Sequence, residues 1–167
     1  MSILTIDVET TTSNNGNPFD KTNKLCYVGM KWLDIDNVDI IDYLTGDKET
    51  YRTYIQDVIN KAEMLVGFNI KFDLHWLLNI GIDLSNVNNI WDCQIAQFML
   101  HSQRNPYNSL NDALEEYNIP LKEDKVKEYW EQGVDTPYIP KEIIMSYLKW
   151  DVKSTELVYL KQKEILV

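Results

Sequence analysis

The chain is poor in the residues that most often bind zinc or carry out cysteine and histidine chemistry. It has two cysteines and two histidines among 167 residues. Cys26 and Cys93 form no short-spaced metal motif, and we expect both to be core residues of a protein that acts in the cytosol. His75 and His101 are too far apart for the helical two-histidine zinc motif and lack its glutamate. The sequence therefore contains no short zinc-binding pattern.

Other common signatures are also missing. The chain has six glycines but no glycine-rich phosphate loop, and it has no G-x-S-x-G turn that would present a serine nucleophile. A Ser-His-Asp triad without such a turn stays open at this point. No apolar run is long enough to span a bilayer, and the N-terminus has no basic stretch followed by an apolar one. We therefore expect no membrane association.

Positive charge is scarce as well. Lysine and arginine number 16 against 26 acids, which gives a net charge of −10. Proteins that grip long nucleic acids usually present a basic surface, because phosphate neutralisation and counterion release dominate the affinity. Two interpretations fit this charge. Either the protein does not bind nucleic acid, or it holds only a short stretch through metal ions, with help from a partner. Charge alone argues mildly against a nuclease.

The apolar content is sufficient for one substantial core. Hydrophobic residues make up 44% of the chain, and we predict a single domain over residues 1–167. The first half is strand-rich. Alternation predicts a strand at 2–9, and a polar segment at 10–24 predicts a mobile loop. Four more elements follow before residue 70: strands at 24–34 and 37–44, a helix at 51–62 with Tyr54 on its apolar stripe, and a buried strand at 63–69.

The second half is helical. The predicted helices cover 72–81, 91–102, 110–118, 126–133 and 141–164. The last one has a buried stripe formed by Ile144, Leu148, Val152 and Leu157. This order of elements predicts an α/β fold of ribonuclease H-like type. Its mixed sheet would have three antiparallel strands followed by parallel strands, and helices would flank it.

Two acids lie in the first predicted strand. Asp7 and Glu9 share one face of that strand, because side chains alternate with a period of two. An acid at a strand end is usually just solvated. An acid within an otherwise buried strand, however, costs several kcal/mol unless a cation compensates it. Two carboxylates that point the same way are what a shared divalent cation requires.

A third acid follows the second apolar strand. Asp73 is the second-to-last residue of the segment GFNIKFDL. It lies four residues after Asn69, at the point where a helix is predicted to begin. Either residue would be favourable there as a helix cap or at the positive end of the helix. The end of a central strand is also where α/β sheets place ligands. Asp73 is therefore a candidate ligand that would also stabilise the start of the helix.

The fourth acid lies in the last predicted helix. Tyr147 and Asp151 are four residues apart and share one helix face. Taken alone, an exposed acid on an amphipathic helix is the ordinary explanation. The coincidence with the two upstream segments favours a shared site for hard divalent cations. Its ligands would be Asp7, Glu9, Asp73 and Asp151.

In combination these segments resemble the DEDD superfamily of 3′→5′ exonucleases, which includes the proofreading domains of DNA polymerases and ribonuclease D. The first motif, D-x-E, is Asp7-Val8-Glu9, the second ends at Asp73, and the third, Y-x-x-x-D, runs from Tyr147 to Asp151. The resemblance covers nearly the whole chain in the right order. Tyr147 indicates the tyrosine (DEDDy) subfamily, and the chain is similar to the proofreading domains of family A polymerases.

The resemblance implies a two-metal mechanism. Two Mg²⁺ or Mn²⁺ ions about 4 Å apart would clamp the scissile phosphate, and Asp7 would bridge them. Glu9 and Asp151 would complete the site of the attacking water, and Tyr147 would orient that water. Asp73 would hold the second ion through water. The product would be a nucleoside 5′-monophosphate released from a 3′ end.

The substrate and partner stay open. Thr10 and Asn69 are expected to contact the substrate. The leading hypothesis is a free-standing exonuclease for single-stranded DNA 3′ ends, the proofreading part of a split polymerase, with a polymerase or another replication protein as partner. The alternatives are an exoribonuclease similar to ribonuclease D and a catalytically idle nuclease fold kept as a binding module. The usage of Asn, Ile and Lys suits an AT-rich genome such as a phage's, which would place the protein in the host cytoplasm.

Overall fold

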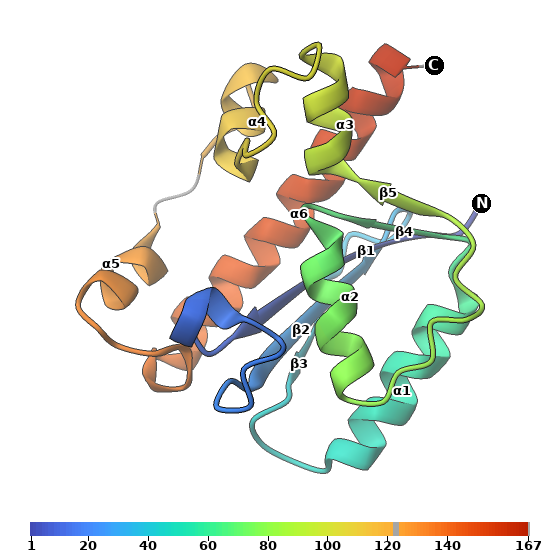
Figure 1. Ribbon diagram of the computed structural model, residues 1–167. Coiled ribbons are helices and arrows are strands. Elements are labelled where there is room, and N and C mark those ends of the chain that lie inside the picture. Colours follow the sequence, from blue (N-terminus) through green and yellow to red (C-terminus); the bar gives the residue numbers. More distant parts are fainter. Residues whose placement is uncertain (122–123, 167) are drawn as a thin grey trace.

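The centre of the computed structural model, which describes residues 1–121 and 124–166, is a five-stranded mixed sheet (Figure 1). The strands are β1 (Ile3–Thr10), β2 (Leu25–Trp32), β3 (Asp39–Asp42), β4 (Met64–Gly67) and β5 (Ile90–Asp92). The helices are α1 (Lys48–Lys61), α2 (Ile70–Asn79), α3 (Cys93–Leu100), α4 (Leu110–Glu116), α5 (Lys125–Glu131) and α6 (Lys141–Leu166). Two short 3₁₀ helices, η1 (Ser13–Gly16) and η2 (Thr136–Tyr138), lie in the connections.

The sheet has the strand order β3-β2-β1-β4-β5. β2 is antiparallel to both β1 and β3, whereas β4 is parallel to both β1 and β5. The connection from β3 to β4 passes through α1, as a crossover to a parallel strand requires. This arrangement confirms the predicted α/β fold, in which three antiparallel strands are followed by parallel ones.

The two faces of β1 pack into different cores. Leu4, Ile6 and Val8 pack with apolar residues of α1 and α2. Ile3, on the other face, packs with Val158 of α6. Asp7 and Glu9 alternate with the first set and therefore lie on the same face as Ile3. α6 contacts β1, β2 and β4, so this long helix covers the face that carries the two acids.

The helix predicted at 91–102 is wrong at its start. Residues Ile90–Asp92 form the edge strand β5, which pairs in parallel with β4. α3 begins only at Cys93, and the Asp92 carboxylate caps it by accepting a hydrogen bond from the N–H of Gln94. A strand of three residues carries no measurable periodicity, so the apolar pattern of the following helix extended over it.

Two residues assigned to buried stripes are on the surface. Tyr54 of α1 is 43% exposed and Leu157 of α6 is 41% exposed. The buried stripe of α6 continues through Val158 and Tyr159 instead. Both predicted cysteine positions are confirmed, because Cys26 and Cys93 are fully buried.

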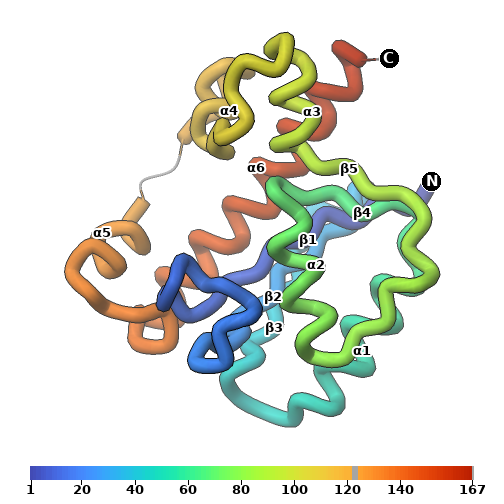
Figure 2. The backbone as a smooth tube through the Cα atoms, in the orientation of Figure 1, coloured from blue at the N-terminus to red at the C-terminus, as the bar shows by residue number. Residues whose placement is uncertain are grey.

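The loop between β1 and β2 is hydrogen-bonded to the rest of the fold. The indole N–H of Trp76 donates to the carbonyl of Gly16 at 3.0 Å, and the amide of Asn79 donates to the carbonyl of Pro18 at 2.7 Å. In Figure 2 this segment lies against α2. Across the part of the chain that the structure describes, no helix is both long enough and apolar enough to cross a membrane.

Candidate metal centre

Two elements bring three carboxylates together. Asp7 and Glu9 extend from β1, and Asp151 extends from α6, which covers that face of the sheet. One carboxylate oxygen from each of the three residues lies within 4.8 Å of the others. Glu9 is buried, and the other two acids are partly buried. Three acids far apart in the sequence therefore form one cluster in the fold.

A glycine in β2 lets α6 lie close to the sheet. Gly29 is the residue that pairs with Asp7 across the antiparallel strands. A β-carbon at Gly29 would lie 2.9 Å from Cγ2 of Val152 and 3.0 Å from Cγ of Leu148. These two residues flank Asp151 on α6. The absence of a side chain at Gly29 thus sets how closely the helix carries Asp151 toward β1.

Asp73 joins the cluster at the open edge of β1. β4 pairs with β1 only as far as Thr5, so the following residues of β1 have no strand neighbour on that side. The Asp73 carboxylate takes the place of that neighbour and accepts a hydrogen bond from the N–H of Val8 at 2.9 Å. Its side chain also shares a hydrogen bond with Asp7, and Asp73 is only 2% exposed. The structure therefore brings all four predicted acids together.

Ionisation of the buried acids is unfavourable in the absence of a cation. Burial raises the pKa of Asp7 and of Glu9 well above the usual range, and the neighbouring carboxylates raise both further. Burial also raises the pKa of Asp73 to about 8, although the hydrogen bond from Val8 opposes the shift. Within residues 1–121 and 124–166, none of these three acids has an ion-pair partner. Buried carboxyls in this state keep protons unless a cation replaces them.

The donor set fits a small, hard divalent cation. Every ligand offered by Asp7, Glu9 and Asp151 is a carboxylate oxygen, the type of ligand that Mg²⁺ and Mn²⁺ prefer. A cation would also offset the burial and the mutual repulsion that raise the pKa values of Asp7 and Glu9. The acidic cluster is therefore able to hold a divalent metal, with Asp73 adjoining through Asp7.

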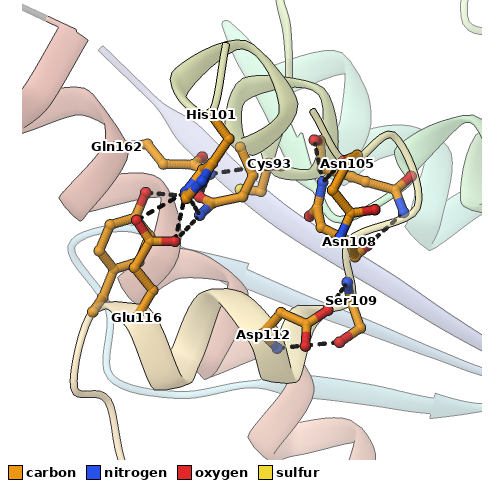
Figure 3. A network of polar contacts seen from close by, with 11 residues as sticks. Cys93, His101, Asn105, Asn108, Ser109, Asp112, Glu116 and Gln162 are labelled. Atoms are coloured by element: carbon orange, nitrogen blue, oxygen red, sulfur yellow. Dashed lines mark hydrogen bonds and ion pairs between the residues drawn. The ribbon is translucent and has the colours of Figure 1, made fainter. Parts of the chain in front are cut away.

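Tyr147 lies in a pocket beside the cluster. The pocket has a volume of about 230 Å³ and is lined by Tyr147, Trp150 and Asp151 of α6, by Asp124 and by the start of α4, where Ser109 lies (Figure 3). Burial and then the charges of Asp151 and Glu9 raise the pKa of the Tyr147 hydroxyl, so it stays protonated at neutral pH. Its ring packs edge-to-face on Trp130, with ring centres 5.7 Å apart.

Asp124 is a residue of this pocket that the sequence did not single out. Its carboxylate caps α5 by accepting from the N–H of Lys127 at 2.9 Å. Its charge also raises the pKa values of Glu9 and Tyr147. In the sequence, an acid just before a helix is indistinguishable from an ordinary cap.

The predicted substrate residue Thr10 is buried against the following loop. Its hydroxyl donates to the carbonyl of Thr11 at 2.9 Å. Gly16, whose φ is +70°, packs so closely that a β-carbon there would lie 2.5 Å from Oγ1 of Thr10. Thr10 therefore helps to hold the loop that follows β1, and its contact with substrate stays a prediction.

Asn69 is exposed at the start of α2 in a left-handed conformation, with φ 55°. Its side chain makes no capping hydrogen bond, so of the two residues considered as caps Asn69 does not take that role through its side chain. The Asp92 carboxylate takes that role instead and accepts from the N–H of Asn69 at 3.0 Å and of Ile70 at 3.2 Å. Asp92 was missed because it reaches α2 only through the pairing of β5 with β4. A substrate contact of Asn69 stays a prediction.

Comparison with known proteins assigns the family. A family model described as 3′-5′ exonuclease matches residues 1–165. The chain belongs to this 3′-5′ exonuclease family, and the protein is a hydrolase of that type. No curated protein sequence matches the chain.

Among solved structures, the fold is similar to part of a family B DNA polymerase from the hyperthermophilic archaeon Pyrobaculum calidifontis. The TM-score is 0.60 at 15% sequence identity, and the match covers 97% of this chain. It covers 24% of the polymerase chain, so the protein spans a small part of that polymerase's length. At this identity the similarity shows the α/β fold alone.

Proposed function

We propose that the protein is a metal-dependent 3′→5′ exonuclease that releases nucleoside 5′-monophosphates from single-stranded DNA 3′ ends. The observation that carries the proposal is the convergence of Asp7, Glu9 and Asp151 within 4.8 Å in a chain of the 3′-5′ exonuclease family. Residues 1–167 would form one exonuclease domain. Tyr147, one helical turn before Asp151, supports assignment to the tyrosine subfamily.

The four acids are the proposed metal ligands. Asp7, Glu9 and Asp151 would hold one Mg²⁺ or Mn²⁺, and Asp73 would contribute with Asp7 to a second. When bound, such ions neutralise phosphate charge and lower the pKa of a water molecule. In their absence Asp7 and Asp73 share a hydrogen bond, and their raised pKa values favour protonation. Metal binding would therefore release protons.

Tyr147 is the proposed positioning group for the attacking water. Its pKa is raised, so its hydroxyl is a hydrogen-bond donor at neutral pH rather than a base. The edge-to-face contact with Trp130 restrains the ring. The adjoining pocket of about 230 Å³ suits one terminal nucleoside rather than a duplex. Thr10 and Asn69 are proposed as further contacts with the strand.

A direct assay tests the function. DNA and RNA single strands of equal sequence, labelled at the 5′ end, are incubated side by side with Mn²⁺. We expect the DNA to shorten stepwise from its 3′ end, with nucleoside 5′-monophosphates as products. EDTA should stop the reaction, and added Mg²⁺ or Mn²⁺ should restore it.

The other outcomes separate the remaining hypotheses. Faster hydrolysis of RNA would favour an exoribonuclease similar to ribonuclease D. Binding without hydrolysis of either strand would favour an idle binding module. Hydrolysis that persists in EDTA would reject the metal mechanism.

We also propose a polymerase or another replication protein as partner. The fold matches 24% of a chain described as a DNA polymerase, which supports an exonuclease that works beside a polymerising unit. Crosslinking in the source cells, followed by mass spectrometry, tests this partner. Phage origin and a cytoplasmic location stay predictions.

A further inference from the structure

A second concave surface lies at the far end of the loop that follows β1. Its volume is about 710 Å³, and it is lined by residues 18–21, 23 and 24 of the loop, Leu25 at the start of β2, Tyr43, Lys48 and the last part of α2. The same loop begins directly after Glu9 and Thr10, so one segment joins this groove to the acidic cluster. In Figures 1 and 2 the loop lies between α2 and the helix α5 that precedes the start of α6.

The groove concentrates positive charge in an acidic protein. Lys21, Lys24 and Lys48 line it, and all three are exposed. Across the described residues none of the three has an ion-pair partner, whereas the whole chain carries a net charge of −10. The acid in the groove, Asp20, is occupied by hydrogen bonds from Thr22 and Asn14.

The groove also contains an exposed aromatic ring, and hydrogen bonds fix the loop that carries it. Phe19 is 74% exposed and packs edge-to-face on His75 at 5.2 Å. Lys48 lies 5.3 Å above the ring of Tyr43. The hydrogen bonds from Trp76 and Asn79 to the loop carbonyls hold the lining residues in place before any ligand arrives. Less ordering entropy is then lost on binding.

We propose that this groove binds the phosphodiester backbone of a single-stranded polynucleotide, upstream of the 3′ end that occupies the acidic cluster. Lysines without an ion-pair partner among the described residues, beside the exposed ring of Phe19, are a combination that binds single strands without sequence preference. The proposal rests on the proposed exonuclease function. It explains how a chain with few basic residues retains a strand between successive cleavages.

Binding without hydrolysis tests the groove independently of catalysis. A labelled dT strand of about 12 nucleotides is titrated in EDTA, and fluorescence anisotropy is recorded from 50 to 200 mM salt. The variant is Lys21→Gln/Lys24→Gln/Lys48→Gln, which keeps most of each side-chain stem. The control is Lys163→Gln, which removes a lysine that lies 6.0 Å above the Tyr159 ring in the last turn of α6.

We expect the triple variant to bind at least about tenfold more weakly at 50 mM salt. Its plot of log affinity against log salt should be shallower by about 2, because each phosphate contact with a single strand contributes about 0.7. The control should stay within about twofold of the parent. A labelled rU strand of the same length shows whether the groove distinguishes DNA from RNA, and similar losses with both support backbone binding.

Three results would contradict the proposal that the groove binds a single strand. The triple variant binding as tightly as the parent is the first, and an equal loss in the Lys163→Gln control is the second. The third is tighter binding of a poly-glutamate peptide than of dT, since an acidic protein segment would then be the occupant. If thermal unfolding shows that the triple variant is damaged, the single charge reversal Lys21→Glu replaces it with the same expected direction.

The two proposals fail in different ways. If the groove proposal is wrong and the exonuclease proposal is right, the protein hydrolyses DNA with Mn²⁺, and its affinity for the strand in EDTA is the same in the parent and in the triple variant. If the exonuclease is wrong and the groove right, no strand is shortened, yet binding in EDTA still falls in the triple variant.

Discussion

Carboxylates of α6 meet the sheet at two places, and at one of them a buried lysine forms an ion pair with the acid. Glu156 of α6 forms an ion pair with Lys31 of β2, with Nζ 2.7 Å and 2.8 Å from the two carboxylate oxygens. Both side chains are almost fully buried. Asp151, five residues earlier and about 7.5 Å along the helix axis, lies beside Asp7 and Glu9, with one carboxylate oxygen of each residue within 4.8 Å of the others.

The difference arises from two positions of β2. Lys31 pairs with Thr5, and Gly29 pairs with Asp7, on the same face of the sheet. At Lys31 a long basic side chain fills the space under α6 and compensates Glu156. At Gly29 there is no side chain, so the helix comes close and the acids face one another. The first place holds a complete ion pair, while the second holds a cluster of carboxylates whose oxygen donors fit a divalent cation.

The largest expected effect is on catalysis. Asp7→Asn or Asp151→Asn should reduce hydrolysis about a thousandfold or more, because several kcal/mol of charge stabilisation by the metals would be lost. Metal-free Asp7→Asn should fold as well as the parent, since it removes a buried carboxyl that repels its neighbours. Steady-state hydrolysis and circular dichroism measure the two properties. The control is Asp57→Asn, which changes a surface acid paired with Lys61. Full activity in Asp7→Asn or Asp151→Asn would contradict the assignment of these acids to the active site.

The second-largest expected effect is on stability, at the buried ion pair of Lys31 and Glu156. Lys31→Met leaves Glu156 buried without its cation, which should lower the free energy of unfolding by about 3–5 kcal/mol. In a chain of this length the melting temperature should fall by about 2–4 °C for each kcal/mol. Activity per folded molecule should change little. The double variant Lys31→Met/Glu156→Leu should recover most of the loss, and a double variant as unstable as the single one would argue against a paired-charge role.

Some of this contrast was predictable from residue pattern. The spacing of Asp7, Glu9, Asp73, Tyr147 and Asp151 indicated the cluster, and the alternation of β1 indicated the face. The Lys31–Glu156 pair was not predictable, because it depends on the register of β2 against β1 and on the rotation of α6. The same holds for Asp92, whose bonds to α2 require the short edge strand β5. Local periodicity reports which face a residue occupies, whereas its partner across the fold depends on tertiary packing.

The third effect is the dependence of stability on pH and metal. Asp73 has a folded pKa of about 8, above its ordinary value of 3.8. A raised pKa contributes stability that is full below the unfolded value and is lost as pH rises through the folded value. Metal-free protein should therefore lose stability between about pH 4 and pH 8, and Asp7 and Glu9 act in the same direction.

Mg²⁺ or Mn²⁺ should counter this loss. At a metal concentration of about 100 Kd the gain is about 2.7 kcal/mol, or roughly 5–10 °C in melting temperature. The gain should be large at pH 8 and small at pH 5, where protons compete for the carboxyls. Differential scanning fluorimetry measures it, with Ca²⁺-free buffer and EDTA as reference. Equal stabilisation at both pH values, or the same gain in Asp7→Asn, would contradict binding at the cluster.

The smallest effect tests Gly29 itself. Gly29→Ala places a methyl 2.9 Å from Val152, so α6 must move away by a few tenths of an ångström. Overpacking of this kind costs about 1–3 kcal/mol. Because Asp151 moves with the helix, the Mn²⁺ midpoint for thermal stabilisation should rise and hydrolysis should fall by about tenfold. A purely structural role for Gly29 would lower the melting temperature without changing the metal midpoint.

A compensating variant separates helix position from core stability. In Gly29→Ala/Val152→Ala the shortened side chain makes room for the new methyl, so α6 can return toward β1. The Mn²⁺ midpoint should then recover toward the parent value. The melting temperature should not recover, because Val152 is a fully buried core residue and its truncation leaves a cavity. If midpoint and melting temperature instead changed together in both variants, the distance between α6 and the sheet would not be what tunes the metal centre.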